Sequence, residues 1–108
     1  MQNTIYNNPI RKKGKSLYSF SYFHSDVYGN MKVHFRYKSA LANVFTVKIY
    51  DNSDVLEITD NTNLTVQANW TKSGLITISI SGLSAEIKKI IITTSEDLEI
   101  KFLSILEV

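Results

Sequence analysis

The most constraining feature of the sequence is the stretch NMKVHFRYKS at residues 30–39, which alternates apolar and basic side chains without interruption. Its apolar set is Met31, Val33, Phe35 and Tyr37, and its basic set is Lys32, His34, Arg36 and Lys38. A period of two belongs to a β-strand, since successive side chains of a strand point to opposite faces. The stretch therefore predicts a strand with an apolar face in the core and a basic face turned toward water or a ligand.

Similar stretches recur along the chain and predict an all-β fold. We expect strands at residues 16–24, 30–39, 42–51, 55–59, 63–68, 70–82, 86–95 and 97–108, with turns at 26–30, 51–54 and 60–63. Isoleucine, valine, threonine and aromatic residues favour a sheet, while Gly, Asn and Asp mark the turns. About eight short strands, with turns about every 8 to 12 residues, predict an antiparallel β-sandwich of the jelly-roll type. Residues 83–89 fit either one helical turn capped by Ser84 or a loop leading straight into a strand.

The chain of 108 residues predicts one domain preceded by a short arm. Residues 1–15 are polar, hold the only proline and carry four basic side chains, so we expect a basic N-terminal arm. This arm would be either a solvated tail or a segment that docks on a partner. Residues 16–108 would then form the single β-sandwich domain.

Composition excludes several classes of protein. The chain has no cysteine, which rules out disulfides, cysteine-bound zinc and a catalytic thiol. The net charge of +2 is too balanced to predict a nucleic-acid partner, and no apolar run is long enough to cross a membrane. The N-terminus lacks the apolar segment of a secretory signal. We therefore expect synthesis in the cytoplasm, with no membrane or nucleic-acid partner.

No catalytic or metal-binding pattern stands out in the sequence. Two histidines, His24 and His34, are the only side chains that ordinarily exchange protons near neutral pH. The acidic turns at 51–54 and 60–63 lack the ligand spacing of an EF-hand, and a glycine-rich phosphate loop is absent. These acidic residues predict turns rather than a cation site. We therefore expect a protein that is not an enzyme and needs no cofactor.

Three segments resemble a known family: FRYKSALANVFTVKIYD at 35–51, NWTKSGLITISISG at 69–82 and IKKIIITTSEDLEIKFLSILEV at 87–108. Their succession resembles that of the galactose-binding-like jelly-roll carbohydrate-binding modules, which occur on glycoside hydrolases and on phage tail and baseplate proteins. The similarity covers about residues 31–108 and rests on the order of strands. It implies a jelly roll that binds carbohydrate without catalysis. Where many relatives place a carboxylate that helps hold calcium, this chain has Lys101, so we expect no calcium there.

Aromatic and basic side chains are the candidates for holding a glycan. Sugar rings stack on aromatic faces, and neighbouring charged or amide groups bond the hydroxyls, while Arg36 can fork onto a carboxylate or phosphate. The predicted ligand-binding set is Tyr50, Arg36, His34, Lys48, Asn52 and Tyr28. The alternative for the basic row is an ordinary solvated strand face. We expect Trp70 to be a partly buried packing residue.

Two functions follow from these expectations. The first is a non-catalytic module that recognises a cell-surface or cell-wall polysaccharide, as part of a phage tail or baseplate. The second is a structural virion or assembly protein that uses the same sandwich, its edge strands and the basic arm for protein contacts. A shallow site binds weakly and gains affinity from several copies, so we expect a homo-oligomer or a larger assembly.

Overall fold

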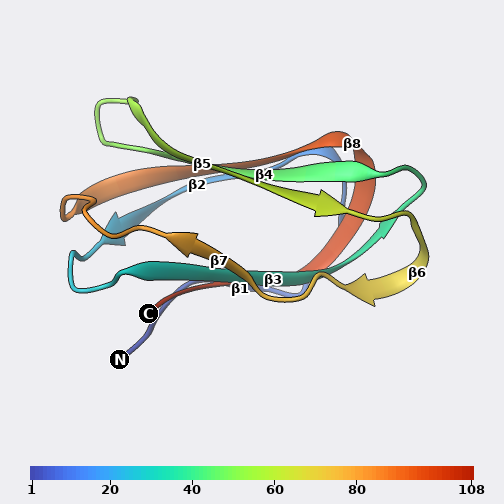
Figure 1. Cartoon of the computed structure of the whole chain (residues 1–108), viewed down its shortest axis with the longest axis horizontal. Helices are drawn as coiled ribbons and strands as arrows, with labels where there is room; N and C mark the ends of the chain where they lie inside the picture. Colours follow the sequence, from blue (N-terminus) through green and yellow to red (C-terminus); the bar gives the residue numbers. More distant parts are fainter.

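The structure is a computed structural model that describes residues 1–108, and it contains eight strands and no helix (Figure 1). The strands are β1 (Asn3–Asn8), β2 (Lys12–His24), β3 (Asn30–Ser39), β4 (Asn43–Tyr50), β5 (Leu56–Leu64), β6 (Gln67–Lys72), β7 (Ile76–Ser79) and β8 (Glu86–Glu107). All the pairings are antiparallel. The predicted all-β antiparallel sandwich of about eight strands is confirmed.

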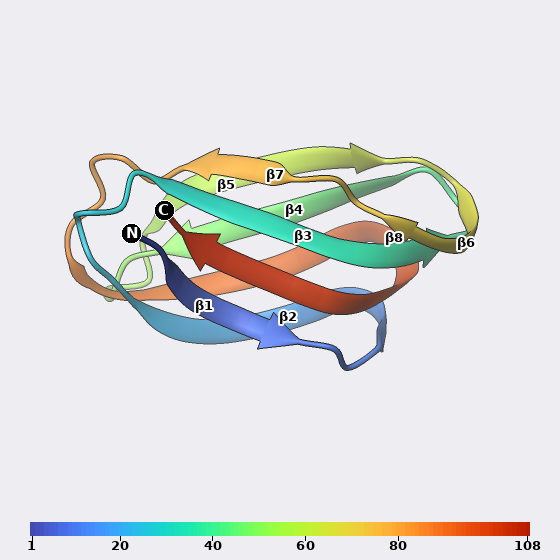
Figure 2. The same ribbon diagram turned by 90° about the horizontal axis from the view of Figure 1, so that it is seen from below.

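The long strand β8 belongs to both layers of the sandwich, because it bends near its middle (Figures 1 and 2). Its first half pairs with β4 and β2, and β5 pairs with β4 at the outer edge; these strands form the β4 layer. Its second half pairs with β1 on one side and β3 on the other, and β6 and β7 both pair with β3; these strands form the β3 layer. Strand β2 follows the bend of β8, since Lys12–Gly14 pair with Leu98–Ile100 in its second half. The layers are therefore joined by continuous strands, which fixes how they face each other.

The core lies between the two layers and consists of 20 buried apolar residues. From β3 it takes Met31, Val33, Phe35 and Tyr37, as the alternation predicts, and from β4 it takes Phe45, Val47 and Ile49. The rings of Phe35 and Phe45 lie 4.4 Å apart between centroids and join the layers directly. Because the apolar face of β3 is buried, its basic face forms the outside of the β3 layer.

The predicted N-terminal arm is wrong, since most of residues 1–15 belong to the sheets. Strand β1 pairs with Leu103–Glu107 of β8, and β2 already begins at Lys12. Tyr6 of β1 stacks on Phe20 with a centroid distance of 4.9 Å and meets Tyr18 edge-on at 5.5 Å. Two adjacent apolar residues, Ile5 and Tyr6, are a weak sequence signal. They suffice here because the second half of β8 offers an unpaired edge, and covering that edge forms main-chain hydrogen bonds.

Several other boundaries differ from the predictions. Residues 60–63 are not a turn; they continue β5 and pair with Val44–Val47 of β4. They are polar because β5 is an edge strand, and polar side chains discourage edge-to-edge association. Residues 63–68 are divided between β5 and β6, and residues 70–82 between β6 and β7. The predicted strands 86–95 and 97–108 are one continuous strand.

Residues 83–89 form no helical turn, and the alternative, a loop leading directly into a strand, is the one observed. Glu86 opens β8, and Lys88 and Ile90 point inward with the period of two. The turn predicted at 51–54 is present: the Asp51 carboxylate accepts hydrogen bonds from the backbone N–H groups of Ser53 and Val55. No helix in the structure has the length and apolar character needed to cross a membrane.

Candidate ligand-binding site

Three basic side chains line up across neighbouring strands on the outer face of the β3 layer. Arg36 of β3 lies in register with Lys101 of β8 on one side and with Lys72 of β6 on the other. We call these three residues the cation row. None of them forms an ion pair, since the ion pairs of the protein join other residues. Like charges directly opposite each other destabilise a sheet, so this arrangement is a cost to the fold that a bound anion would relieve.

A β-bulge in β8 places an aromatic ring beside the cation row. His34 lies opposite Ser104 and Arg36 opposite Lys101, so Phe35 alone faces the two intervening residues of β8. The first of these, Phe102, has a φ of 54°, a left-handed conformation that is rare for a bulky residue. Because of the bulge, Lys101 and Phe102 both face outward, although a regular strand would turn one of them inward.

The Phe102 ring is 48% exposed and lies close to two members of the cation row. The Arg36 guanidinium is 5.8 Å from the ring centroid and the Lys101 ammonium is 5.6 Å from it. A second aromatic, Trp70 of β6, is half-buried, and the ammonium groups of Lys101 and Lys38 lie 4.1 and 5.0 Å from its centroid. Backbone strain that a surrounding structure maintains is concentrated at functional sites. Here the strained backbone of Phe102 holds its ring on the outer face of the sheet.

A shallow groove of about 530 Å³ opens next to Phe102. Its lining residues are His34, Phe35, Arg36, Lys72, Gly74, Leu75 and Phe102. The groove exists because β6 ends at Lys72 and β7 begins only at Ile76, so the connecting residues leave the sheet. Ser73 anchors this connection: its N–H donates to the Phe35 carbonyl at 2.9 Å, and its Oγ accepts from the Phe35 N–H at 3.0 Å. Apolar walls and cationic groups thus meet in one concave surface, which is typical of small-ligand sites.

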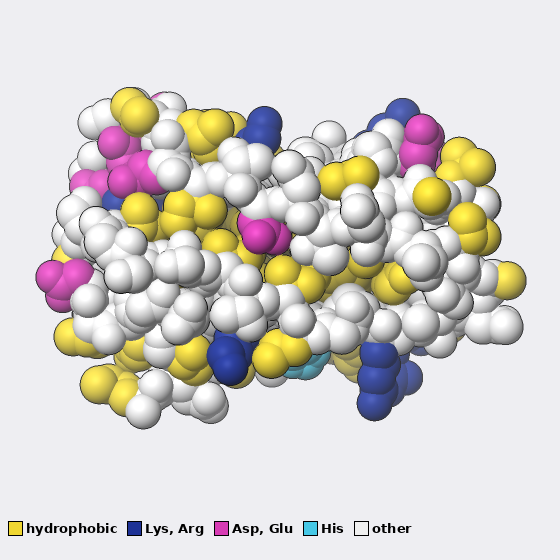
Figure 3. Space-filling view, viewed as in Figure 1, with side chains coloured by type: hydrophobic (Ala, Val, Ile, Leu, Met, Phe, Trp, Pro, Cys, Tyr) yellow, Lys and Arg dark blue, Asp and Glu magenta, His cyan; other side chains and the backbone are white.

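The outer face of the β3 layer lies at the lower edge of the molecule in Figures 1 and 3. Lys, Arg and His side chains project from that edge in the space-filling view. Figure 2 looks onto the same layer from below and shows β1, β8, β3 and the β6–β7 segment side by side. The site is therefore built on strands, with only the short connection at Ser73–Leu75 outside regular structure.

The structure brings together only two of the six predicted site residues, His34 and Arg36. Tyr50 and Lys48 lie on the outer face of β4, which is the opposite side of the sandwich, because Val47 and Ile49 fill the core. The other two predicted residues are Asn52, in the turn after β4, and Tyr28, in the loop before β3. One small ligand cannot contact both sets.

Sequence reasoning missed Lys72, Lys101, Phe102 and Leu75. A signal for Phe102 exists, because the inward positions of β8 run Leu98, Ile100, Leu103 and Ile105. The step of three between Ile100 and Leu103 breaks the period of two and predicts a bulge. No comparable signal exists for Lys72, because its register with Arg36 depends on a long-range pairing.

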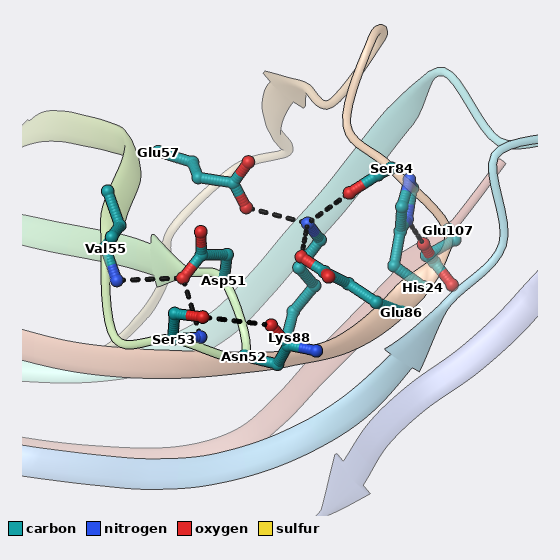
Figure 4. Close-up of polar contacts among 10 residues, drawn as sticks. All are labelled: His24, Asp51, Asn52, Ser53, Val55, Glu57, Ser84, Glu86, Lys88 and Glu107. Atoms are coloured by element: carbon teal, nitrogen blue, oxygen red, sulfur yellow. Dashed lines mark hydrogen bonds and ion pairs between the residues drawn. The ribbon is translucent and has the colours of Figure 1, made fainter.

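A second polar cluster lies at the end of the sandwich where β2 and β3 meet, and it is shown in Figure 4. Lys88 is fully buried, and its ammonium donates to Glu57 at 2.7 Å, to Glu86 at 2.8 Å and to Ser84 at 3.4 Å. Burial disfavours its charge, but the hydrogen bonds and charges of Glu57 and Glu86 outweigh burial, so the pKa of Lys88 is raised above 10.5. All three donors have partners, which indicates a structural role.

His24 and Glu107 form a buried pair in the same region. His24 Nδ1 lies 2.6 Å from Glu107 Oε2, and the Asn3 side-chain amide donates to Glu107 Oε1 at 3.3 Å. The Nε2 atom of His24 has no partner within the protein. Neither residue lines the groove beside Phe102. The pair therefore ties β2 to the end of β8 rather than presenting a reactive group to a ligand.

Alkaline pH is expected to destabilise the protein through buried phenols and Lys88. Burial, with a smaller effect of Tyr6, raises the pKa of Tyr18 from 10.0 to about 12, and burial followed by Glu107 and Glu57 raises that of Tyr22 further. The folded chain then holds protons that the unfolded chain releases. The stabilisation from these groups is complete below pH 10 and is lost as the pH rises toward 12. Urea denaturation between pH 8 and 12 should show this fall, and Tyr18→Phe/Tyr22→Phe should flatten it; an equal fall in that variant would contradict this attribution.

No protein-family model and no curated protein matches the chain. Two solved structures share its fold. The enzymatically active domain of bacteriophage CBA120 tailspike protein 4 superposes with a TM-score of 0.65 and 9% identity, covering 99% of this chain and 19% of that chain. The arabinose-bound MgGH51 α-L-arabinofuranosidase superposes with a TM-score of 0.51 and 10% identity, covering 79% of this chain and 15% of that chain. The chain thus spans less than a fifth of each, and the similarity shows a shared β-sandwich.

Proposed function

We propose that this chain is a non-catalytic glycan-binding module whose ligand lies in the groove beside Phe102. The observation that carries the proposal is the β-bulge at Phe102. Its strained backbone holds an exposed aromatic ring next to the cation row, whose members form no ion pair. Sugar rings stack their C–H faces on such a ring, and Arg36, His34 and Lys72 can donate hydrogen bonds to hydroxyl or acidic oxygens.

The composition of the groove supports binding without hydrolysis. Glycoside hydrolysis ordinarily requires two carboxyl side chains flanking the scissile bond. The side chains around this groove are basic, aromatic or aliphatic, and no Asp or Glu is among them. From this lining we expect the groove to bind a sugar chain that passes over the surface of the sheet.

The two structural neighbours support a carbohydrate-related setting. One is named a phage tailspike protein and the other an arabinofuranosidase, and in each the region similar to this chain is a minor part of a larger protein. We propose that this module likewise acts beside other domains or subunits, for example in a phage tail, where several copies would raise its apparent affinity. The alternative of an assembly protein relied on the edge strands and on a basic N-terminal arm, and the segment predicted as the arm instead contributes β1 and the start of β2.

The proposal is tested by binding of the purified chain to a panel of immobilised bacterial surface polysaccharides. We expect selective retention on one or a few of them, with Arg36→Ala reducing affinity about tenfold because a forked donor is lost. Tyr50→Ala is the matched control: it removes an equally plausible sequence candidate from the opposite face of the sandwich and should bind as the wild type does. Loss of binding in Tyr50→Ala with retention in Arg36→Ala would refute the site.

A further inference from the structure

We infer that the ligand of this face is an acidic polysaccharide, one that carries carboxylate groups along its chain and sets them against the cation row. This inference rests on the proposed function and narrows it to a class of glycan. It follows from how the three cations are placed rather than from how many basic residues the chain has.

The cation row has a defined geometry. Neighbouring strands of a sheet are about 4.8 Å apart, so side chains in register on three strands extend over about 10 Å. Lys101, Arg36 and Lys72 occupy these three strands in register with each other. A single small anion would need only one or two of these positions. A row of this length matches a chain that brings more than one acidic group to the surface.

The row also lacks internal neutralisation. An acidic side chain at a neighbouring position of the sheet would ordinarily compensate three adjacent cations. The acidic side chain closest to the cation row in the strand register is Glu99, which lies opposite Lys38. Glu99 forms no ion pair with any Lys or Arg. The remaining neighbours of the cations are the rings of Phe102 and Trp70. In the unbound protein the cations repel one another, and a bound polyanion removes that repulsion.

The arrangement favours an acidic glycan over single-stranded nucleic acid. Proteins that bind single strands combine a basic groove with several rings on which successive bases stack. Apart from the imidazole of His34, the groove has one exposed ring, that of Phe102, because the ring of Phe35 is buried in the core. Trp70 is not among the lining residues, and the ammonium groups of Lys101 and Lys38 lie against its ring. One stacking position with cations on both sides suits one sugar ring flanked by acidic groups.

The test compares acidic polysaccharides with their neutral counterparts. Polygalacturonate, alginate and hyaluronate would be titrated with the full chain by calorimetry, each beside the same polymer after reduction of its carboxyl groups, with oligothymidylate as a nucleic-acid probe. We expect at least one acidic polymer to bind tenfold or more tightly than its reduced form, with affinity that falls as salt rises. The variant Lys72→Gln/Lys101→Gln should lose this preference.

Control variants and the possible outcomes separate this inference from the proposed function. Lys48→Gln removes one charge from the opposite face of the sandwich and should leave the preference intact, and circular dichroism would verify that each variant is folded. Equal binding to acidic and reduced polymers would overturn the inference and keep the glycan-binding module. Binding of oligothymidylate alone, or of none of these polymers, would overturn the inference, and the panel of bacterial surface polysaccharides then decides the proposed function separately.

Discussion

Replacing His24 by leucine is expected to lower the free energy of unfolding by about 3 kcal/mol or more. The substitution leaves Glu107 buried without its closest partner, since His24 Nδ1 lies 2.6 Å from the carboxylate and both side chains are excluded from water. A buried polar group without its partner keeps the whole cost of desolvation. For a domain whose total stability is about 5 to 15 kcal/mol, this is a large share.

The matched control for this prediction is the double variant His24→Leu/Glu107→Leu. Removing both partners leaves no uncompensated group, so its stability should return to within about 1 to 2 kcal/mol of the wild type. Urea denaturation followed by the fluorescence of the single tryptophan measures all three proteins. A double variant no more stable than His24→Leu would contradict the assignment, because packing rather than pairing would then account for the loss.

Replacing Phe102 by glycine is expected to weaken ligand binding strongly while leaving the stability of the protein nearly unchanged. Binding should fall thirtyfold or more, about 2 kcal/mol, because the exposed ring is the central contact of the proposed site. Stability should stay within about 1 kcal/mol of the wild type. Glycine adopts a φ of 54° without strain, and this relief offsets the lost contacts with Arg36 and Lys101.

Phe23→Gly is the matched control for the Phe102 substitution. Phe23 is another exposed phenylalanine in a strand, it lies on β2, and its φ is not left-handed. The same substitution there should lower stability by about 1 kcal/mol, as glycine does within a strand, and should not change binding. If Phe102→Gly instead unfolds the protein or binds like the wild type, the bulge would be a packing feature and not a ligand contact.

The period-two patterns predicted the inward faces of the strands well. The four buried apolar residues of β3 and the three inward isoleucines of residues 76–80 follow directly from the alternation. The failures have physical reasons. Strand β1 is short and mostly polar, and it exists because an edge of β8 accepts it. The polar residues 60–63 belong to β5, but the sequence predicted a turn there because a solvated edge strand and a turn have the same polar composition.

The candidate site was only half predictable from the sequence. His34 and Arg36 share a face because of local alternation, which the sequence displays. The proximity of Lys101 and Lys72 to Arg36 depends on three strands that are far apart in the chain. Their residue types placed Tyr50 and Lys48 in the same predicted site as Arg36. The layer that a strand joins is decided by sheet topology, and β4 joins the layer opposite β3.

The most direct test of this account is the mapping of ligand contacts by amide chemical shifts. The ¹⁵N-labelled chain would be titrated with an oligosaccharide derived from whichever polysaccharide it retains. We predict that the largest shifts fall on three segments brought together by the β3 layer: His34–Arg36, Lys72–Leu75 and Lys101–Ser104. Shifts concentrated on the outer face of β4, around Lys48 and Tyr50, with none at Phe102, would contradict it.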